Sequence, residues 1–273
     1  MANILRQRMK RWVLVALAVM GLDLSMCLGF DLCELRAQPA GVNLEGRSDR
    51  FTAQLQGNVA TVDETTWKID YSRRTLERAE QTSHATDSFN VKGNILWRKT
   101  FDEDGLQESH TIYQYDEKGQ KRVSTTYSRT GERALQTLYA YTADGFLARM
   151  RFTDADATTI STTEVGIADF WTETVEMYKD GEKVSTIYHY DNEIRLDRVS
   201  RNDGHISTEM RYRYVVGKLP SRGTYTTSDG RKYSMTYEYE TDEAGNWTRM
   251  VTYVDGRATE ERVRTITYHN ATN

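Results

Sequence analysis

Cysteine is nearly absent from this chain. Its two cysteines, Cys27 and Cys33, both lie within residues 1–37, which we interpret below as a removed leader. The remainder therefore offers no thiol for a disulfide, a nucleophile or a cysteine-based zinc site. Those three kinds of chemistry are excluded from the mature protein.

Proline and long hydrophobic runs are scarce as well. Only two prolines occur, so strands are rarely interrupted by a residue that lacks a backbone donor. The mean hydropathy is −0.70, whereas a transmembrane barrel needs an apolar outward face on every strand. We therefore set a transmembrane barrel aside and expect no transmembrane span in the mature chain.

Positive charge is in deficit after the leader. Residues 1–37 carry five basic and three acidic side chains, so the remainder has a net charge of −6 within the total of −4. Phosphate recognition requires a basic footprint. We expect no nucleic-acid partner.

The N-terminus differs from everything that follows. Four basic residues precede a short apolar core at residues 12–22, the order that is typical of an export signal. We predict that residues 1–37 are a signal peptide and that residues 38–50 are a flexible lead. The protein is then exported, to the periplasm, to the outer membrane as an associated protein, or to the medium.

Two other interpretations of the leader stay open. Residues 12–30 are about long enough to remain as an uncleaved anchor, and Cys27 would be the modified residue of a lipoprotein. Each alternative also places the bulk of the chain outside the cytoplasm.

Tyrosine is abundant, and it alternates with polar residues. The chain has 17 tyrosines against seven phenylalanines and five tryptophans. In the stretch 205–245, Met210, Tyr212 and Tyr214 fall on one parity, and Glu209 and Arg211 fall on the other. This alternation predicts strands with one wet face.

Pairs of aromatic or β-branched residues at positions i and i+2 recur about every 25 residues. Such a step is typical of a supersecondary repeat. The pairs are Phe89 and Val91, Tyr113 and Tyr115, Tyr139 and Tyr141, Thr163 and Val165, Tyr188 and Tyr190, Tyr212 and Tyr214, and Tyr237 and Tyr239.

Glycine-containing turns separate the strands, and many of them read Asp-Gly. Glycine supplies a positive φ, and Asp bonds its own backbone; we predict a two-residue turn at Asp229-Gly230. The predicted fold is all-β: an antiparallel β-meander of about 25-residue hairpin repeats, curled or two-layered. The β-repeat domain is predicted at residues 51–273, with an irregular start at 51–88 and repeats at 89–268. Within the irregular start, residues 72–81 fit either a short helix or a continued strand, and we favour the strand.

These residues carry a resemblance to a known family. YQYDEKG at 113–119, YAYTADG at 139–145 and YHYDNE at 188–193 resemble the YxYDxxG core of RHS/YD-repeat proteins. The run at 242–268 is similar to the terminal unit of secreted, Bacteroidetes-type members. The resemblance covers about two thirds of the chain and implies an envelope or secreted β-repeat protein without known chemistry. VGIADFW at 165–171 departs from the pattern.

Motifs for catalysis or metal binding are missing. The five histidines are scattered, with no HExxH, and no G-x-S-x-G elbow occurs. Asp102, Asp104, Asp154 and Asp156 resemble pieces of calcium loops, but no closing Glu follows, and turn chemistry accounts for them. We predict no catalytic, cofactor or metal site, although opposed carboxylates of a glycosidase are defined by a separation in space and leave no sequence motif.

The aromatic rows allow two interpretations. They are the buried face of adjacent strands, or part of them forms an uncovered platform for a glycan or a protein. Exposure of Tyr139, Tyr188, Tyr212 and Tyr237 on one continuous face would favour the glycan. The candidate ligand-binding residues are Trp97, Trp171, Tyr188, Tyr212, Tyr237 and Trp247.

Three functional classes follow. The first, which we favour, is an exported, non-catalytic scaffold that binds an envelope protein or glycan, because repetition builds extended surfaces. The second is a glycan-binding module that uses exposed aromatics. The third is an envelope hydrolase, which needs titratable residues with perturbed pKa values in one pocket.

Overall fold

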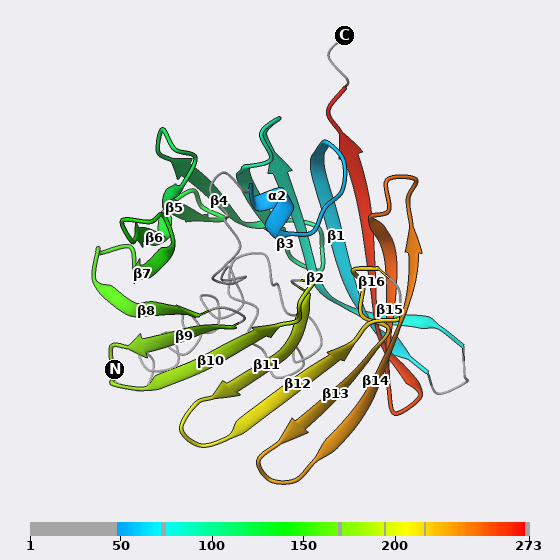
Figure 1. Cartoon of the computed structure of the whole chain (residues 1–273). Coiled ribbons are helices and arrows are strands. Elements are labelled where there is room, and N and C mark those ends of the chain that lie inside the picture. The colour runs from blue at the N-terminus through cyan, green and yellow to red at the C-terminus, as the bar shows by residue number, and fades with distance from the viewer. Residues whose placement is uncertain (1–47, 72–74, 169–170, 194, 216, 271–273) are drawn as a thin grey trace, which may run out of the picture. The chain divides into compact units, whose positions relative to one another are not determined.

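The described residues form one antiparallel β-barrel. The computed structural model describes residues 48–71, 75–168, 171–193, 195–215 and 217–270. Within them, a four-residue helix, α2 (Asp49–Thr52), precedes sixteen strands, and the sheet is closed. In Figure 1 the strands follow one another around the barrel in chain order, from β1 in blue to β16 in red. None of the helices in these ranges has the length and apolarity to cross a membrane.

The strands are six to thirteen residues long. Their bounds are β1 Val59–Asp70, β2 Glu77–Phe89, β3 Ile95–Phe101, β4 Gln107–Tyr115, β5 Lys121–Ser128, β6 Arg133–Tyr141, β7 Leu147–Thr153, β8 Thr159–Ala168, β9 Trp171–Tyr178, β10 Lys183–Tyr190, β11 Leu196–Asn202, β12 Ser207–Arg213, β13 Arg222–Thr227, β14 Lys232–Thr241, β15 Trp247–Val254 and β16 Arg257–Tyr268.

The first and last strands close the sheet. β1 pairs with β16 at nine positions, between Val59↔Tyr268 and Lys68↔Glu260. The predicted all-β class with antiparallel strands is confirmed, but the prediction of a curled or two-layered repeat meander is wrong. Pairing β1 with β16 satisfies the backbone groups of both edges, which would otherwise stay exposed.

The start of the barrel was the part of the sequence that was hardest to interpret. β1 occupies residues 59–70, and the segment from Glu77 to Gln81 belongs to β2, so its prediction as strand rather than helix is confirmed. The predicted signal peptide at 1–37 and most of the lead at 38–50 lie outside the described residues.

Most described loops are longer than two residues. In the loop after β4, the Asp116 carboxylate accepts the backbone N–H groups of Lys118 and Gln120, and Gly119 has a φ of 79°. The loops that begin at Asp154, Asp191 and Asp242 repeat this bonding. The aspartate that begins the loop thus organises it, together with the positive-φ glycine where one is present.

The predicted two-residue turn at Asp229-Gly230 is wrong. β13 ends at Thr227 and β14 begins at Lys232, which leaves a four-residue loop. Asp255 and Gly256 instead form a two-residue turn between β15 and β16, with φ values of 48° and 78°.

Side chains alternate between an inner and an outer wall. On β4, Ser109, Thr111 and Tyr113 are buried, whereas Ile112 is 39% exposed. Cross-strand partners lie on the same face of a sheet. The pairing register therefore shows, strand by strand around the barrel, which side chains face inward and which face outward. The inner wall has a band of buried hydroxyls: Thr111, Ser124, Thr126, Thr137, Thr163, Thr172, Thr174 and Thr186.

The second tyrosine of several YxY pairs ties one hairpin to the hairpin before it. The Tyr115 hydroxyl donates to the Ile95 carbonyl at 2.7 Å. Tyr214 donates to the Leu196 carbonyl at 2.8 Å, and Tyr239 to the Pro220 carbonyl at 2.9 Å. These bonds satisfy partly buried phenols and explain why tyrosine, rather than phenylalanine, recurs at this position.

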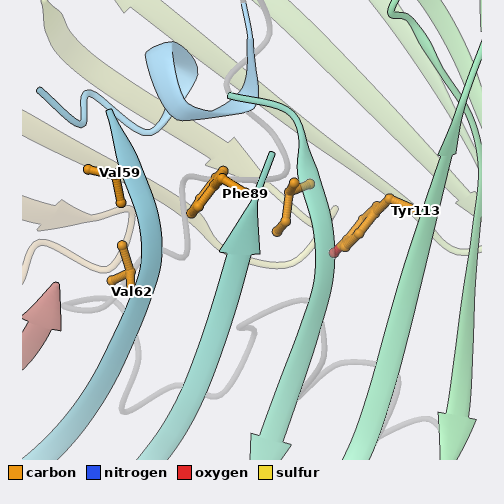
Figure 2. Packing of buried hydrophobic residues seen from close by; sticks show 5 residues of the cluster. Val59, Val62, Phe89 and Tyr113 are labelled. Carbon is orange, nitrogen blue, oxygen red and sulfur yellow. The ribbon is translucent and has the colours of Figure 1, made fainter. Parts of the chain in front are cut away.

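A hydrophobic cluster fills the inner wall of β1 to β4 near α2. It contains Val59, Val62, Phe89, Ile95 and Tyr113, and Leu55 packs against it. Figure 2 shows four of these side chains on adjacent strands, with the ring of Tyr113 directed toward the others.

The segment 48–58, which we call the strap, fixes this end of the barrel. The Asp49 carboxylate accepts the Tyr115 hydroxyl at 2.6 Å and the Ile95 N–H at 3.0 Å, and it pairs with Lys121 at 2.9 Å. The strap therefore ties the start of β1 to β3, β4 and β5.

Candidate functional site

The six predicted ligand-binding residues do not form one surface. Those that face inward are Tyr188, Tyr212, Tyr237 and Trp247. Trp97 faces outward, and Trp171 begins β9, where its side chain lies outside the described part of the structure. Because Tyr188 is 3% exposed and Tyr139 is partly buried, the exposure that would have favoured a tyrosine platform for glycans is not found.

A cluster of charged residues lies on the inner wall beside the closing seam. Glu64 on β1 accepts hydrogen bonds from Arg262 and Arg264 on β16, the latter at 2.6 Å. The Arg264 guanidinium stacks over the Trp247 ring, 3.5 Å from its centroid. Burial by itself raises the pKa of Glu64, but the two guanidinium charges outweigh it and hold the pKa at about 2. Glu64 is therefore ionised at neutral pH.

Glu260 lies on the same wall and behaves in the opposite way. Burial raises its pKa; nearby Arg262 lowers it, and Glu64 adds a further increase. Its Oε1 has no hydrogen-bond partner within the described residues. A pair of carboxyls with diverging pKa values is a pattern found in acid–base catalysis, but both oxygens of Glu64 already bind arginine.

Tyrosines extend this cluster along β14 and β12. The rings of Tyr237 and Tyr239 lie 6.4 Å apart at 31°. Gly223 on β13 leaves space for the Tyr237 hydroxyl, because a Cβ atom at position 223 would lie only 3.1 Å from it. Burial and the neighbouring Tyr212 raise the pKa of Tyr237. These hydroxyls therefore stay protonated at neutral pH, which suits hydrogen bonding and not general-base catalysis.

A second inner cluster lies on β8 to β11. Burial raises the pKa of Glu176 more than the nearby hydroxyls of Tyr178 and Ser161 and the charge of Arg201 lower it. The raised pKa of Tyr178 also comes first from burial. This carboxyl is more costly to ionise than an exposed one.

The outer wall carries ion pairs along many strands. Arg149 and Glu164 pair across β7 and β8 at 2.6 Å, with side chains 59% and 41% exposed. On β15, Arg249 pairs with Glu240 at 3.0 Å and with Glu261 at 2.6 Å. The exposed members of these pairs are compatible with water on this wall, whereas contact with lipid would be costly. Glu261 is only 6% exposed.

Aromatic groups gather on the outer wall of β2 to β4. His84 stacks on Phe101 with centroids 4.6 Å apart, and Trp97 meets His110 edge to face at 6.1 Å. The Lys99 ammonium lies 5.2 Å from the Trp97 centroid. Burial lowers the pKa of His110, and the Lys99 charge lowers it further, so His110 is neutral at pH 7.

No group of three or more His, Cys, Asp or Glu side chains suited to a metal occurs among the described residues. Asp102 and Asp154, which resembled pieces of calcium loops, instead accept backbone N–H groups of their own turns. The absence of a cofactor and of catalysis remains a prediction.

Sequence reasoning missed the charged inner cluster. Glu64 and Arg264 are separated by 200 positions, and only the closure of the barrel brings them together. The alternation Arg262-x-Arg264 on one strand parity was an available signal, because two arginines on a buried face require a buried partner.

Comparisons with known proteins identify no family. No family model and no curated protein matches the chain. Among solved structures, it is similar to a porin-like protein from Bacteroides uniformis, at 12% identity over 78% of this chain and 98% of that one, with a TM-score of 0.41. A porin-like protein from Bacteroides vulgatus gives 12% identity over 78% and 100%, with a TM-score of 0.36. A Photorhabdus luminescens Tc holotoxin pore gives 18% identity over 66% and 9%, with a TM-score of 0.20. At these scores the likenesses carry no argument about function.

The predicted membership of the RHS/YD-repeat family is therefore wrong. No family model matches, and the strands close into a barrel through the pairing of β1 with β16. Its YxY pairs have a local explanation: the first tyrosine faces the inner wall, and the second, as in Tyr115 and Tyr239, bonds the preceding hairpin. A Tyr-rich barrel thus produces the same motif without kinship.

Proposed function

We propose that this chain is an exported β-barrel of the bacterial envelope that serves as a rigid, non-catalytic binding scaffold, with water on its outer wall. The basic and apolar segments within residues 1–37 support export.

The observation that carries the proposal is the charged outer wall. Several charged side chains point outward from their strands and are well exposed: Arg149, Glu164, Arg211 and Glu240. Insertion of an Arg at the middle of a bilayer costs about 2–4 kcal/mol, so a lipid-facing role is disfavoured. A water-facing wall leaves the surface available for a macromolecular partner.

The inner wall supports a scaffold more than a reaction centre. Glu64 is held by two arginines, and Asp49 by Lys121 and Tyr115. Charged groups that are satisfied by one another stabilise a single arrangement and leave little capacity to bind a reacting atom.

Fractionation of cells that express the full chain tests the proposal. We expect the mature protein in the periplasmic or envelope fraction, and we expect alkaline carbonate to release any membrane-associated part. Retention in the membrane after a carbonate wash, as for an integral barrel, would contradict a water-facing outer wall.

Hydrolysis is the second candidate, and it is favoured by Glu260, whose raised pKa contrasts with that of Glu64. The test is release of reducing sugars from envelope polysaccharide by the wild type and by Glu260→Gln. Activity that disappears in this variant, with the fold retained, would replace the scaffold proposal.

A further inference from the structure

One sector of the outer wall differs from the rest in having almost no charge. Two adjacent rows of outward side chains lie on β3 to β6. One row runs Lys99↔His110↔Tyr127 on β3 to β5 and is bordered on β6 by Arg133, the partner of Tyr127. The other row runs Trp97↔Ile112↔Thr125↔Gln136 on β3 to β6. The Gln136 amide lies 3.5 Å from the Thr125 hydroxyl, which confirms that the row shares one side. We call these two rows the neutral wall.

Within the two rows Lys99 is the one Lys, Arg, Asp or Glu, and Arg133 borders them on β6. The Lys99 ammonium lies over the Trp97 ring, and the pKa of His110 beside it is lowered by burial and by this ammonium. Elsewhere on the outer wall, neighbouring strands carry pairs of opposite charge, as in Arg149 facing Glu164 and Arg198 diagonal to Glu209. The neutral wall is therefore a distinct chemical surface.

The fold does not require aromatic and apolar groups at these positions. They lie on the side of the sheet opposite the buried core, and Ile112 is 39% exposed. Trp97 and Tyr127 are partly exposed beside it, and aromatic and aliphatic surface that stays in contact with water marks a binding site more often than chance. Trp and Tyr offer rigid contact area at a small entropic cost.

The composition selects the kind of ligand. Trp97 and Tyr127 offer ring surface to C–H groups, while Gln136 and Thr125 offer uncharged hydrogen-bonding groups. An ionised ligand would lose hydration along the row from Trp97 to Gln136 without meeting an opposite charge, because Lys99 and Arg133 lie in or beside the other row. A polymer of uncharged sugars has apolar C–H faces and many hydroxyls, and it meets no such penalty.

The rows also have the reach for a polymer. Neighbouring strands lie about 4.8 Å apart, so a row from β3 to β6 spans roughly 14 Å. That length suits several linked sugars lying across the strands better than one free sugar.

We propose that the neutral wall binds a neutral polysaccharide, with Trp97 and Tyr127 as the ring contacts. This inference rests on the proposed scaffold function and specifies its partner.

Affinity electrophoresis of the full mature chain tests it, in native gels that contain dextran, galactomannan or xyloglucan as neutral probes and alginate as an acidic probe. The test variant is Trp97→Ala with Tyr127→Ala. The matched control is Tyr253→Ala, which removes an outward aromatic from β15 in the charged sector. Circular dichroism of each variant verifies the β fold.

We expect at least one neutral probe, and not alginate, to slow the wild type. We expect the affinity of the double variant to fall by a factor of about ten or more. The affinity of the control should stay within about twofold of the wild type. Equal retardation of wild type and double variant would overturn the assignment to this wall.

A wild type that none of the neutral probes slows would overturn the polysaccharide as ligand. If the wild type then sediments as a dimer and the double variant as a monomer, the neutral wall belongs to a second copy of the chain. Carbonate extraction tests the water-facing outer wall of the proposed scaffold separately, because its result does not depend on any ligand.

Discussion

The side-chain amide of Asn246 and the backbone of Gln56, 190 positions apart, hydrogen-bond to each other in both directions. The Gln56 N–H donates to Asn246 Oδ1 at 2.6 Å, and Asn246 Nδ2 donates to the Gln56 carbonyl at 3.0 Å. The same amide donates to the Tyr268 hydroxyl at 2.7 Å. Asn246, which is 3% exposed, thereby ties the strap to the end of the loop between β14 and β15, next to the seam that closes the barrel.

Replacing Asn246 tests this tie. Asn246→Ala leaves the Gln56 N–H and C=O without their partner, and we expect it to lower the free energy of unfolding by about 1–3 kcal/mol. Asn246→Asp keeps an acceptor for the N–H, but it loses the donor and buries a carboxylate next to the Gln56 carbonyl, so it should destabilise the protein at least as much at pH 7. Urea denaturation measures both, and equal stability of Asn246→Ala and wild type would contradict the role of this residue.

Glu64 makes acid stability measurable. Its pKa is about 2 in the folded state against an ordinary value of 4.5, so its contribution is complete above about 4.5 and is lost as the pH falls toward about 2. Glu64→Gln leaves Arg262 and Arg264 without their carboxylate, at an expected cost of about 3–5 kcal/mol at pH 7. The variant should also lose part of the acid dependence in denaturation between pH 7 and 3; an unchanged slope would refute the linkage.

Glu176 should behave with the opposite sign. Burial raises its folded-state pKa, so the unfolded chain releases this proton first, and stability declines as the pH rises above the ordinary value of 4.5. Glu176→Gln removes that penalty, and we expect a more stable protein at pH 7, with little change below pH 4. Thermal unfolding at both pH values is the measurement, and a less stable variant at pH 7 would show that the ionised carboxylate is needed.

Tyr115 should control the strap. Tyr115→Phe removes the hydroxyl whose single proton lies between the Asp49 carboxylate, at 2.6 Å, and the Ile95 carbonyl, at 2.7 Å. We expect faster amide hydrogen exchange over residues 48–58, with a cost in stability of about 1–3 kcal/mol.

The matched control for Tyr115→Phe is Tyr214→Phe, which removes the tyrosine bond to the Leu196 carbonyl; Tyr214 follows the end of β12, five strands from β1 in the strand order. It should leave exchange over residues 48–58 unchanged. Equal exchange in the two variants would mean that the strap is held by Lys121 and the backbone alone.

Local features of the sequence predicted local structure well. The period-two alternation around Tyr212 and Tyr214 indicated strands with one buried face, and β12 shows this pattern. Glycines such as Gly119 and Gly145 have the positive φ values that their turns require. These properties depend on a few neighbouring residues, so the chain alone contains them.

The candidate sites were less readable. The sequence ranked Trp97 with Tyr188 and Tyr237, but Trp97 lies on the outer wall and the two tyrosines lie on the inner wall. The parity of a strand divides its residues into two groups, but it does not say which group faces the centre of a barrel. Which of the two groups faces the centre is decided only when the other strands close around one face of the sheet.

What the sequence by itself determined is the alternation, the turns and the antiparallel order of neighbouring strands, because each depends on contacts within about 25 residues. What only the tertiary structure decided is the closure of β1 on β16, and with it the meeting of Glu64 with Arg264 and of Gln56 with Asn246. These contacts join residues that are about 200 positions apart, and nothing in either local sequence specifies its partner. The accumulated twist and curvature of all sixteen strands bring them together.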